Sequence, residues 1–251
     1  MKKAFLYLLL LAGVSLAMIL GGVFFYGLVT NSPWFGRLGI TKGDALVYNM
    51  LLWYVLWAVG LGWLFIHNRW ASFSLGNLRG SRLWACLLLS SLVSLSGEVL
   101  SFVVRNGLEP PTETYLATMQ LYQSHPFMTL AILVVMYCVG QLVLLGAVLR
   151  QLAVSMRRQW LALLLVSLLT AWVQLQDWPY GISVFLFATL LGMFQGWLYL
   201  RTRSIWPAVA GGVVADYLLW MLLGYAPAAW LALVALVVLP LSLYALWRLL
   251  R

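Results

Sequence analysis

The stretch GMFQGWLYLRTRSIWPAVAGGVVAD, from Gly192 to Asp216, joins two apolar segments through a short turn that contains two arginines and a Trp-Pro pair. The second segment carries one carboxylate, Asp216, where a membrane helix is normally apolar. An aspartate at bilayer depth costs roughly 2.5–3.5 kcal/mol to insert, so it is expected to have a partner or a water-filled cavity. The stretch therefore predicts two membrane helices with a polar site on the second.

The composition extends this prediction to the whole chain. Of its 251 residues, 64% are hydrophobic and only 8% are charged, whereas soluble domains carry about 25% charged residues. There is too little polar surface to cover a water-soluble domain, so this is a membrane protein. The net charge of +9 does not indicate nucleic-acid binding, because no basic stripe lies outside the apolar segments.

The apolar segments predict an all-α fold. A membrane-spanning helix needs about 20 apolar residues. Eight segments meet this requirement: 4–29, 46–66, 83–104, 127–150, 159–175, 181–200, 206–224 and 228–247. The first is too long for the apolar region of a signal peptide, and we interpret it as a retained helix. The longest loop, 105–126, is too short for a second domain, so residues 1–251 form a single integral membrane domain.

The basic residues predict the orientation of the eight helices. If the helices alternate, twelve of the fifteen basic residues fall on one side of the membrane. These twelve are Lys2, Lys3, Arg69, Arg79, Arg82, Arg150, Arg157, Arg158, Arg201, Arg203, Arg248 and Arg251. Short loops rich in Lys and Arg face the cytoplasm, so both termini are expected to be cytoplasmic. The short loops and the lysine-led N-terminus favour a prokaryotic cytoplasmic membrane.

Polar side chains inside the apolar segments suggest a candidate pocket. Glu98 and Asp216 are the only acids there, and Gln141 and Gln174 are amides at similar depth. With a helix rise of about 1.5 Å per residue, all four lie about 20–24 Å from the nearest predicted cytoplasmic arginines. They are expected either to line one pocket or to form separate interhelical hydrogen bonds, worth about 0.6 kcal/mol each.

Three blocks of sequence, in this order, resemble one known family. They are GQLVLLGAVLRQL from Gly140 to Leu152, TAWVQ from Thr170 to Gln174, and the opening stretch from Gly192 to Asp216. Together they resemble the motifs of the CAAX-protease and bacteriocin-processing family of intramembrane proteases, also called the Abi family. The third block is the most specific of the three. The resemblance implies a family core over about residues 127–220.

The departures from the family pattern fall on its chemistry. The resemblance implies a site in which paired glutamates and two histidines activate water, with a metal ion. The corresponding positions here are Gly140 and Gln141 for the glutamates, Leu145 for an arginine, Thr170 and Gln174 for Phe and His, Gly212 for the last histidine, and Asp216 for an asparagine. Glutamine cannot take up a proton as a carboxylate does, and glycine offers no side chain. We therefore expect the inherited mechanism to be lost.

We expect neither a metal ion nor another cofactor. Catalytic zinc usually takes three protein ligands, and the candidate pocket offers only Glu98 and Asp216 as strong ligands. The two histidines, His67 and His125, fall in loops on opposite predicted faces and cannot join one site. No Cys/His metal spacing occurs.

Several functions remain open. We favour a non-catalytic binding, assembly or maturation subunit that holds a transmembrane partner, a lipidated peptide or a lipid. A second hypothesis is an intramembrane hydrolase or acyl or peptidyl transferase, with Glu98 and Asp216 as a rebuilt acid pair. A third is a bacteriocin immunity or self-protection protein. A proton transporter is a further alternative, although no pair of discontinuous helices supports it. Membrane lipids and another membrane protein are the expected partners.

Overall fold

The computed structural model describes residues 59–108, 123–156, 158–174, 181–222 and 228–251, with Leu56 and scattered residues between 5 and 27. The side chains at 105–108, 172–174, 181–184, 220, 222 and 228 are outside this description. Most of the first two predicted segments and of the loop 105–126 therefore lies outside the described residues. The same holds for Arg157 and for the side chain of Gln174.

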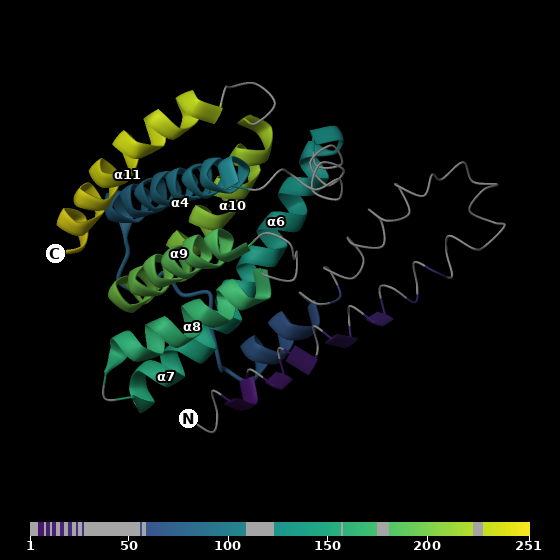
Figure 1. Cartoon of the computed structure of the whole chain (residues 1–251). Coiled ribbons are helices and arrows are strands. Elements are labelled where there is room, and N and C mark those ends of the chain that lie inside the picture. The colour runs from purple at the N-terminus through teal and green to yellow at the C-terminus, as the bar shows by residue number, and fades with distance from the viewer. Residues whose placement is uncertain are drawn as a thin grey trace.

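Helices make up all the regular structure of the described residues (Figure 1). They are α4 (Gly80–Leu108), α6 (Pro126–Gln141), η1 (Leu142–Leu149), α7 (Arg150–Ser155), α8 (Gln159–Gln174), α9 (Gly181–Thr202), α10 (Trp206–Leu222) and α11 (Ala228–Leu250). The elements α6, η1 and α7 follow one another without a break, and η1 is a π-helix. Residues 59–67 are also helical.

Three of these helices are long and apolar enough to cross a membrane. They span Gly80–Val104, Pro126–Ser155 and Ala229–Leu250, and shorter apolar helices cover Gln159–Ala171 and Trp206–Leu219. The predicted all-α, polytopic membrane fold is confirmed. The total of eight spanning helices and the cytoplasmic position of the termini stay predictions.

Helix α4 is central in the bundle. It packs most extensively against α10 and α11, and α9 also contacts it. Figure 1 shows α4 between α11 and α9, with α8 beyond α9. Two clusters show that α4 and α11 run in opposite directions, because Cys86 packs with Leu246 while Val99 packs with Ala235.

The same packing brings the arginine-bearing ends of several helices together. Leu78 and Cys86, at the start of α4, share one cluster with Leu198 near the end of α9 and Leu246 near the end of α11. We call this end of the bundle the arginine end. Its described arginines include Arg79, Arg82, Arg158, Arg201, Arg203, Arg248 and Arg251, all of which are exposed. The structure thus gathers at one end arginines that the sequence placed on one side.

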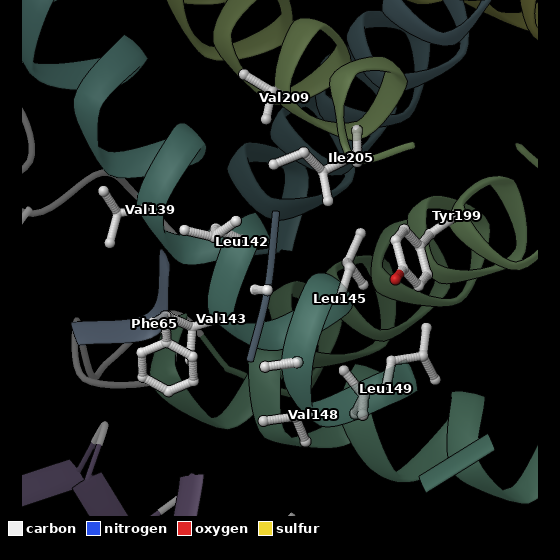
Figure 2. Packing of buried hydrophobic residues seen from close by; sticks show 14 of the residues in the cluster. Phe65, Val139, Leu142, Val143, Leu145, Val148, Leu149, Tyr199, Ile205 and Val209 are labelled. Atoms are coloured by element: carbon white, nitrogen blue, oxygen red, sulfur yellow. The ribbon is translucent and has the colours of Figure 1, made fainter. Parts of the chain in front are cut away.

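The largest apolar core surrounds the π-helix η1. Leu142, Val143, Val148 and Leu149 are fully buried there, and Figure 2 shows them with Phe65 and Ile205 nearby. A π-helix of this length is rare and was not predicted from the sequence. Leu145, at the position of the family arginine, is also buried in this cluster. It therefore contributes to packing and not to a polar site.

Glycine spacing explains how α9 packs on α8. A Cβ atom at Gly192 would lie 3.1 Å from Cα of Ser167, and one at Gly196 would overlap the side chain of Leu163. Gly192 thus faces Ser167, and Gly196, further along α9, faces Leu163, which is earlier in α8. These two helices are therefore antiparallel. The GxxxG pair thus lets the two backbones approach closely.

The turn between α9 and α10 is fixed by its own side chains. The Thr202 hydroxyl donates to the carbonyl of Leu198 at 2.7 Å, and its oxygen accepts the N–H of Ser204 at 3.2 Å. The backbone of Arg203 has a φ of 56°. These bonds satisfy backbone groups that the ends of two helices would otherwise leave unpaired.

The segment that precedes α4 closes over this turn. Gly76 has a φ of 61°, and a Cβ atom there would overlap the backbone of Thr202 and Arg203. The N–H of Asn77 donates to the Thr202 carbonyl at 2.8 Å, and the Trp206 indole N–H donates to the Phe73 carbonyl at 3.3 Å. The motif YLRTRSIWP is therefore the docking surface for residues 73–77.

Candidate functional site

A small polar cavity lies at mid-helix depth inside the bundle. Its volume is about 40 Å³, and α4, α6, α8, α9 and α10 all contribute to its wall. The polar side chains around it are Ser94, Glu98, Tyr137, Gln141, Thr170, Gln195 and Asp216. One water needs roughly 10–15 Å³ of such space, so the cavity has room for about three or four water molecules.

Three of the four side chains proposed for a shared pocket line this cavity. Glu98 comes from α4, Gln141 from the last residue of α6, and Asp216 from the middle of α10. Gln174 ends α8, and its side chain lies outside the described residues. The sequence predicted that these side chains lie at a similar depth along their helices. The structure adds that the three helices are rotated so that all three side chains face the same cavity.

The other motif positions divide between the cavity and the rest of the bundle. Thr170 and Gly212 line the cavity, whereas Gly140 and Leu145 do not. The Thr170 hydroxyl donates to the Val166 carbonyl of its own helix at 2.9 Å. A Cβ atom at Gly140 would meet nothing within 4 Å. Gly140 therefore contributes no space to the cavity.

Tyr137 fills the space beside Gly212. A Cβ atom at Gly212 would overlap the ring of Tyr137, so the aromatic ring rests directly on the backbone of α10. The Tyr137 hydroxyl then reaches one turn further and donates to Oδ2 of Asp216 at 2.6 Å. The absent side chain at Gly212 does not enlarge the pocket. It admits a ring from α6, which packs against the backbone of α10.

A pair of amides closes another side of the cavity. Nε2 of Gln141 donates to Oε1 of Gln195 at 2.9 Å, and both side chains are buried. This bond links α6 to α9. For Gln141, the interhelical hydrogen bond that we offered as the alternative to a pocket is thus present together with the cavity.

Ser94 is a polar residue of the cavity that has no partner. Ser94 is only 1% exposed, and its buried Oγ atom makes no hydrogen bond. It lies against α10, where a Cβ atom at Gly211 would come within 2.6 Å of it. A buried hydroxyl beside a cavity of this size is a place where an ordered water fits.

Sequence reasoning missed Tyr137 and Ser94, although each leaves a signal. Tyr137 lies one helical turn before Gln141, on the same face of α6, and a tyrosine in an apolar helix usually finds a partner for its O–H. Ser90, Ser94, Gly97 and Ser101 follow the spacing of one face of α4. Such a stripe of small residues marks a face where another helix approaches closely.

The cavity does not fit the metal ion that the family resemblance implies. Catalytic zinc takes three protein ligands as a rule, and here only Glu98 and Asp216 bear carboxyl groups. One oxygen of Asp216 already accepts the Tyr137 hydroxyl. In the part of the chain that the structure describes, no three His, Cys, Asp or Glu residues are grouped closely enough to hold a metal. His67 and His125 are exposed, and neither lines the cavity.

Comparison with known families finds one match. Residues 122–218 match the family model described as type II CAAX prenyl endopeptidase Rce1-like. Comparisons with curated proteins and with solved structures give no match. The matched residues run from the start of α6 to α10, and they include Tyr137, Gln141, Gln195 and Asp216 but neither Ser94 nor Glu98 of α4. The match over residues 122–218 is to the same family that the sequence motifs indicated, which confirms that resemblance for this part of the chain.

Proposed function

We propose that this chain is a non-catalytic Rce1-like membrane protein. In this proposal it acts as a binding, assembly or maturation subunit that holds a transmembrane partner, a lipidated peptide or a lipid. The contact between Tyr137 and Gly212 is the observation that supports it best. The resemblance implies a histidine at position 212, and any side chain there would overlap the Tyr137 ring. A ring now fills the space from which that histidine would act.

The size of the cavity supports the same proposal. About 40 Å³ admits water, whereas ligand pockets are typically about 300–1,000 Å³. A peptide bond therefore cannot enter without movement of α6 or α10. The bond from Tyr137 to Asp216 and the bond from Gln141 to Gln195 tie α6 to α10 and to α9. We interpret the polar residues as a fixed inner network of a protein that binds its partner elsewhere on its surface.

A second candidate function rests on the two carboxyl groups. Glu98 and Asp216 line one cavity that has room for water. Two carboxyl groups in different environments can serve as general acid and general base. A hydrolase or a transferase that uses this pair is therefore the alternative, and it requires the cavity to open for its substrate.

One experiment separates the two functions. The tagged chain is transferred from its native membrane into lipid nanodiscs, as the wild type and as the variants Glu98→Gln and Asp216→Asn. We expect one stoichiometric protein, lipidated peptide or lipid to accompany all three forms, with no cleavage of a synthetic lipidated peptide by any of them. Cleavage by the wild type that either substitution abolishes would establish the second function. Wild-type protein that carries no stoichiometric companion would refute the first.

The proposal includes the location of the protein. We place the chain in a prokaryotic cytoplasmic membrane, with the arginine end toward the cytoplasm. The gathering of seven exposed arginines at that end supports this orientation. Modification of cysteines introduced at the arginine end, by a reagent that cannot cross the membrane, measures it directly. Labelling of intact cells at this end would contradict the orientation.

A further inference from the structure

An apolar groove lies on the surface of the bundle, separate from the polar cavity. Its volume is about 470 Å³, and it is open to the surroundings. Six side chains from three helices line it, namely Leu163 of α8, Met193, Phe194 and Trp197 of α9, and Leu243 and Trp247 of α11. None of these side chains carries a charge. The chemistry of the groove thus matches a hydrocarbon chain.

Each of the three helices places an arginine just beyond the groove. Arg201 follows Trp197 by four residues, and Arg251 follows Trp247 by four. Arg158 precedes Leu163 by five residues, and because α8 is antiparallel to α9 it lies toward the same end. At a rise of about 1.5 Å per residue, these arginines stand about 6–8 Å beyond the lining residues. Each of the three helices that line the groove therefore carries an arginine about 6–8 Å beyond it, toward the same end of the bundle.

No Asp or Glu side chain in the described part of the chain lies at this end of the groove. The acids described there are Glu98 and Asp216, and both line the inner cavity. Arg158, Arg201 and Arg251 are all exposed. The guanidinium group of Arg251 lies over the ring of Trp247, 4.8 Å from its centroid. This cation–π contact holds a positive charge directly against a side chain that lines the groove.

We propose that the groove binds one anionic phospholipid. One acyl chain lies along the aromatic and aliphatic wall, and the phosphate is bound by Arg158, Arg201 and Arg251. Guanidinium groups suit this role, because they bind phosphate oxygens through paired hydrogen bonds. Basic pockets between membrane helices are known to select anionic headgroups. The groove shares no lining residue with the polar cavity, so binding there requires no change in that cavity.

The test measures lipid binding to the detergent-purified full chain by native mass spectrometry. Phosphatidylglycerol and phosphatidylcholine with identical acyl chains are titrated separately. We expect one tightly bound phosphatidylglycerol, with an affinity at least about tenfold above that of phosphatidylcholine, and weakening of this preference as salt is raised. Equal affinities for the two lipids would overturn the proposal. Displacement of phosphatidylglycerol from the groove by an added lipidated peptide would overturn it as well.

Paired variants separate the headgroup site from general charge. Arg201→Gln with Arg251→Gln should weaken phosphatidylglycerol binding about 25-fold, at about fivefold for each arginine near the lipid surface. Arg79→Gln with Arg82→Gln removes the same charge from the same end, but α4 does not line the groove. This control should keep the wild-type affinity within about twofold. An equal loss in both pairs would mean that only the net charge attracts the lipid, which would refute a site.

A second pair of variants tests the acyl-chain wall. Leu243→Trp should fill the groove and remove the bound lipid, while Leu190→Trp on the exposed face of α9, outside the groove, should retain it. Met193→Trp is a second filling variant, in case one of them disturbs folding. Retention of phosphatidylglycerol by a filling variant that elutes and melts like Leu190→Trp would refute binding in the groove.

Discussion

Gly76 and Gly212 both lie where no Cβ atom fits, yet their neighbours differ in kind. Gly76 rests on the backbone of Thr202 and Arg203, in the turn that leads into α10. Gly212 lies within α10 and rests on the ring of Tyr137. Backbone cannot yield without displacing two helices, whereas a ring can rotate away. The first contact fixes the fold, and the second shapes a site.

This difference separates two kinds of residue within the family motifs, those that pack helices together and those that line the cavity. In the most specific block of the resemblance, from Gly192 to Asp216, the residues up to Pro207 have packing roles. Gly192 lets α9 approach α8, Thr202 holds the turn, and the Pro207 carbonyl accepts the Ser90 hydroxyl at 2.8 Å. Gly212 and Asp216, where the motifs led us to expect departures from the family pattern, line the cavity. A resemblance of this kind supports a shared fold, and it carries no support for shared chemistry.

The largest effect is expected when Gly76 is replaced by alanine. The new Cβ atom would overlap backbone of the α9–α10 turn, and the positive φ adds strain. We expect a loss of about 3 kcal/mol or more in the free energy of unfolding. For a chain of this size, that lowers the melting temperature by about 6–12 °C.

Gly80→Ala is the matched control for this prediction. Gly80 has a φ of 53°, but a Cβ atom there would meet nothing within 4 Å. It should cost only about 1–2 kcal/mol, which is the strain of the left-handed backbone alone. Equal losses in the two variants would show that the close contact at Gly76 contributes nothing.

Replacing Gly212 by alanine should have an intermediate effect. The Cβ atom would push the Tyr137 ring, and such overpacking typically costs about 1–3 kcal/mol. Because the obstacle is a side chain, adding Tyr137→Ala should recover part of this loss in a double-mutant cycle. Gly140→Ala, where the space is open, should be neutral or stabilise the helix by up to about 1 kcal/mol. Thermal unfolding in detergent measures all four variants, and additive effects at Gly212 and Tyr137 would contradict the contact.

A smaller effect is expected from the bond between Tyr137 and Asp216. A cycle of Tyr137→Phe and Asp216→Asn should give a coupling energy of about 0.6–1.7 kcal/mol, the range for interhelical hydrogen bonds in membranes. Tyr217→Phe serves as the control, because this tyrosine is the chain neighbour of Asp216 and packs against the apolar core. Its coupling to Asp216→Asn should stay below about 0.5 kcal/mol. Equal couplings for the two tyrosines would remove Tyr137 from the polar network.

The sequence predicted the class of fold and part of the cavity for one physical reason. Depth in a membrane helix is a linear count from its end, so Glu98, Gln141 and Asp216 could be placed at one level. Rotation about each helix axis depends on packing between helices, which no single segment encodes. Tyr137 was missed for that reason, since its ring reaches the cavity only because Gly212 leaves space.

The contacts of the arginine end were also beyond sequence reasoning. Gly76 docks on Thr202 across more than a hundred residues of chain, and no local pattern predicts that pairing. The π-helix η1 was likewise not predicted, and in the structure Phe65 and Ile205 lie in the same buried cluster as its residues. The sequence alone does not distinguish Gly76 from Gly212. Only their neighbours in the structure show that Gly76 packs on the turn between α9 and α10, whereas Gly212 packs beside the cavity.

The smallest effect, and the one with the most informative sign, is expected on the serine face of α4. Ser90 donates to the Pro207 carbonyl near the arginine end, so Ser90→Ala should cost about 0.5–1.5 kcal/mol. Ser94, one turn further into the bundle, has a buried Oγ without a partner, so Ser94→Ala should change stability by less than about 0.5 kcal/mol or raise it. Thermal unfolding of the two variants side by side checks the difference. A loss at Ser94 as large as at Ser90 would contradict an unpaired hydroxyl and would mean that water in the cavity bonds to Ser94. The polar cavity would then contribute to the stability of the fold, as the contacts at the arginine end do. Gly76 and Gly212 would then differ only in the group that each contacts, which is backbone for Gly76 and an aromatic ring for Gly212.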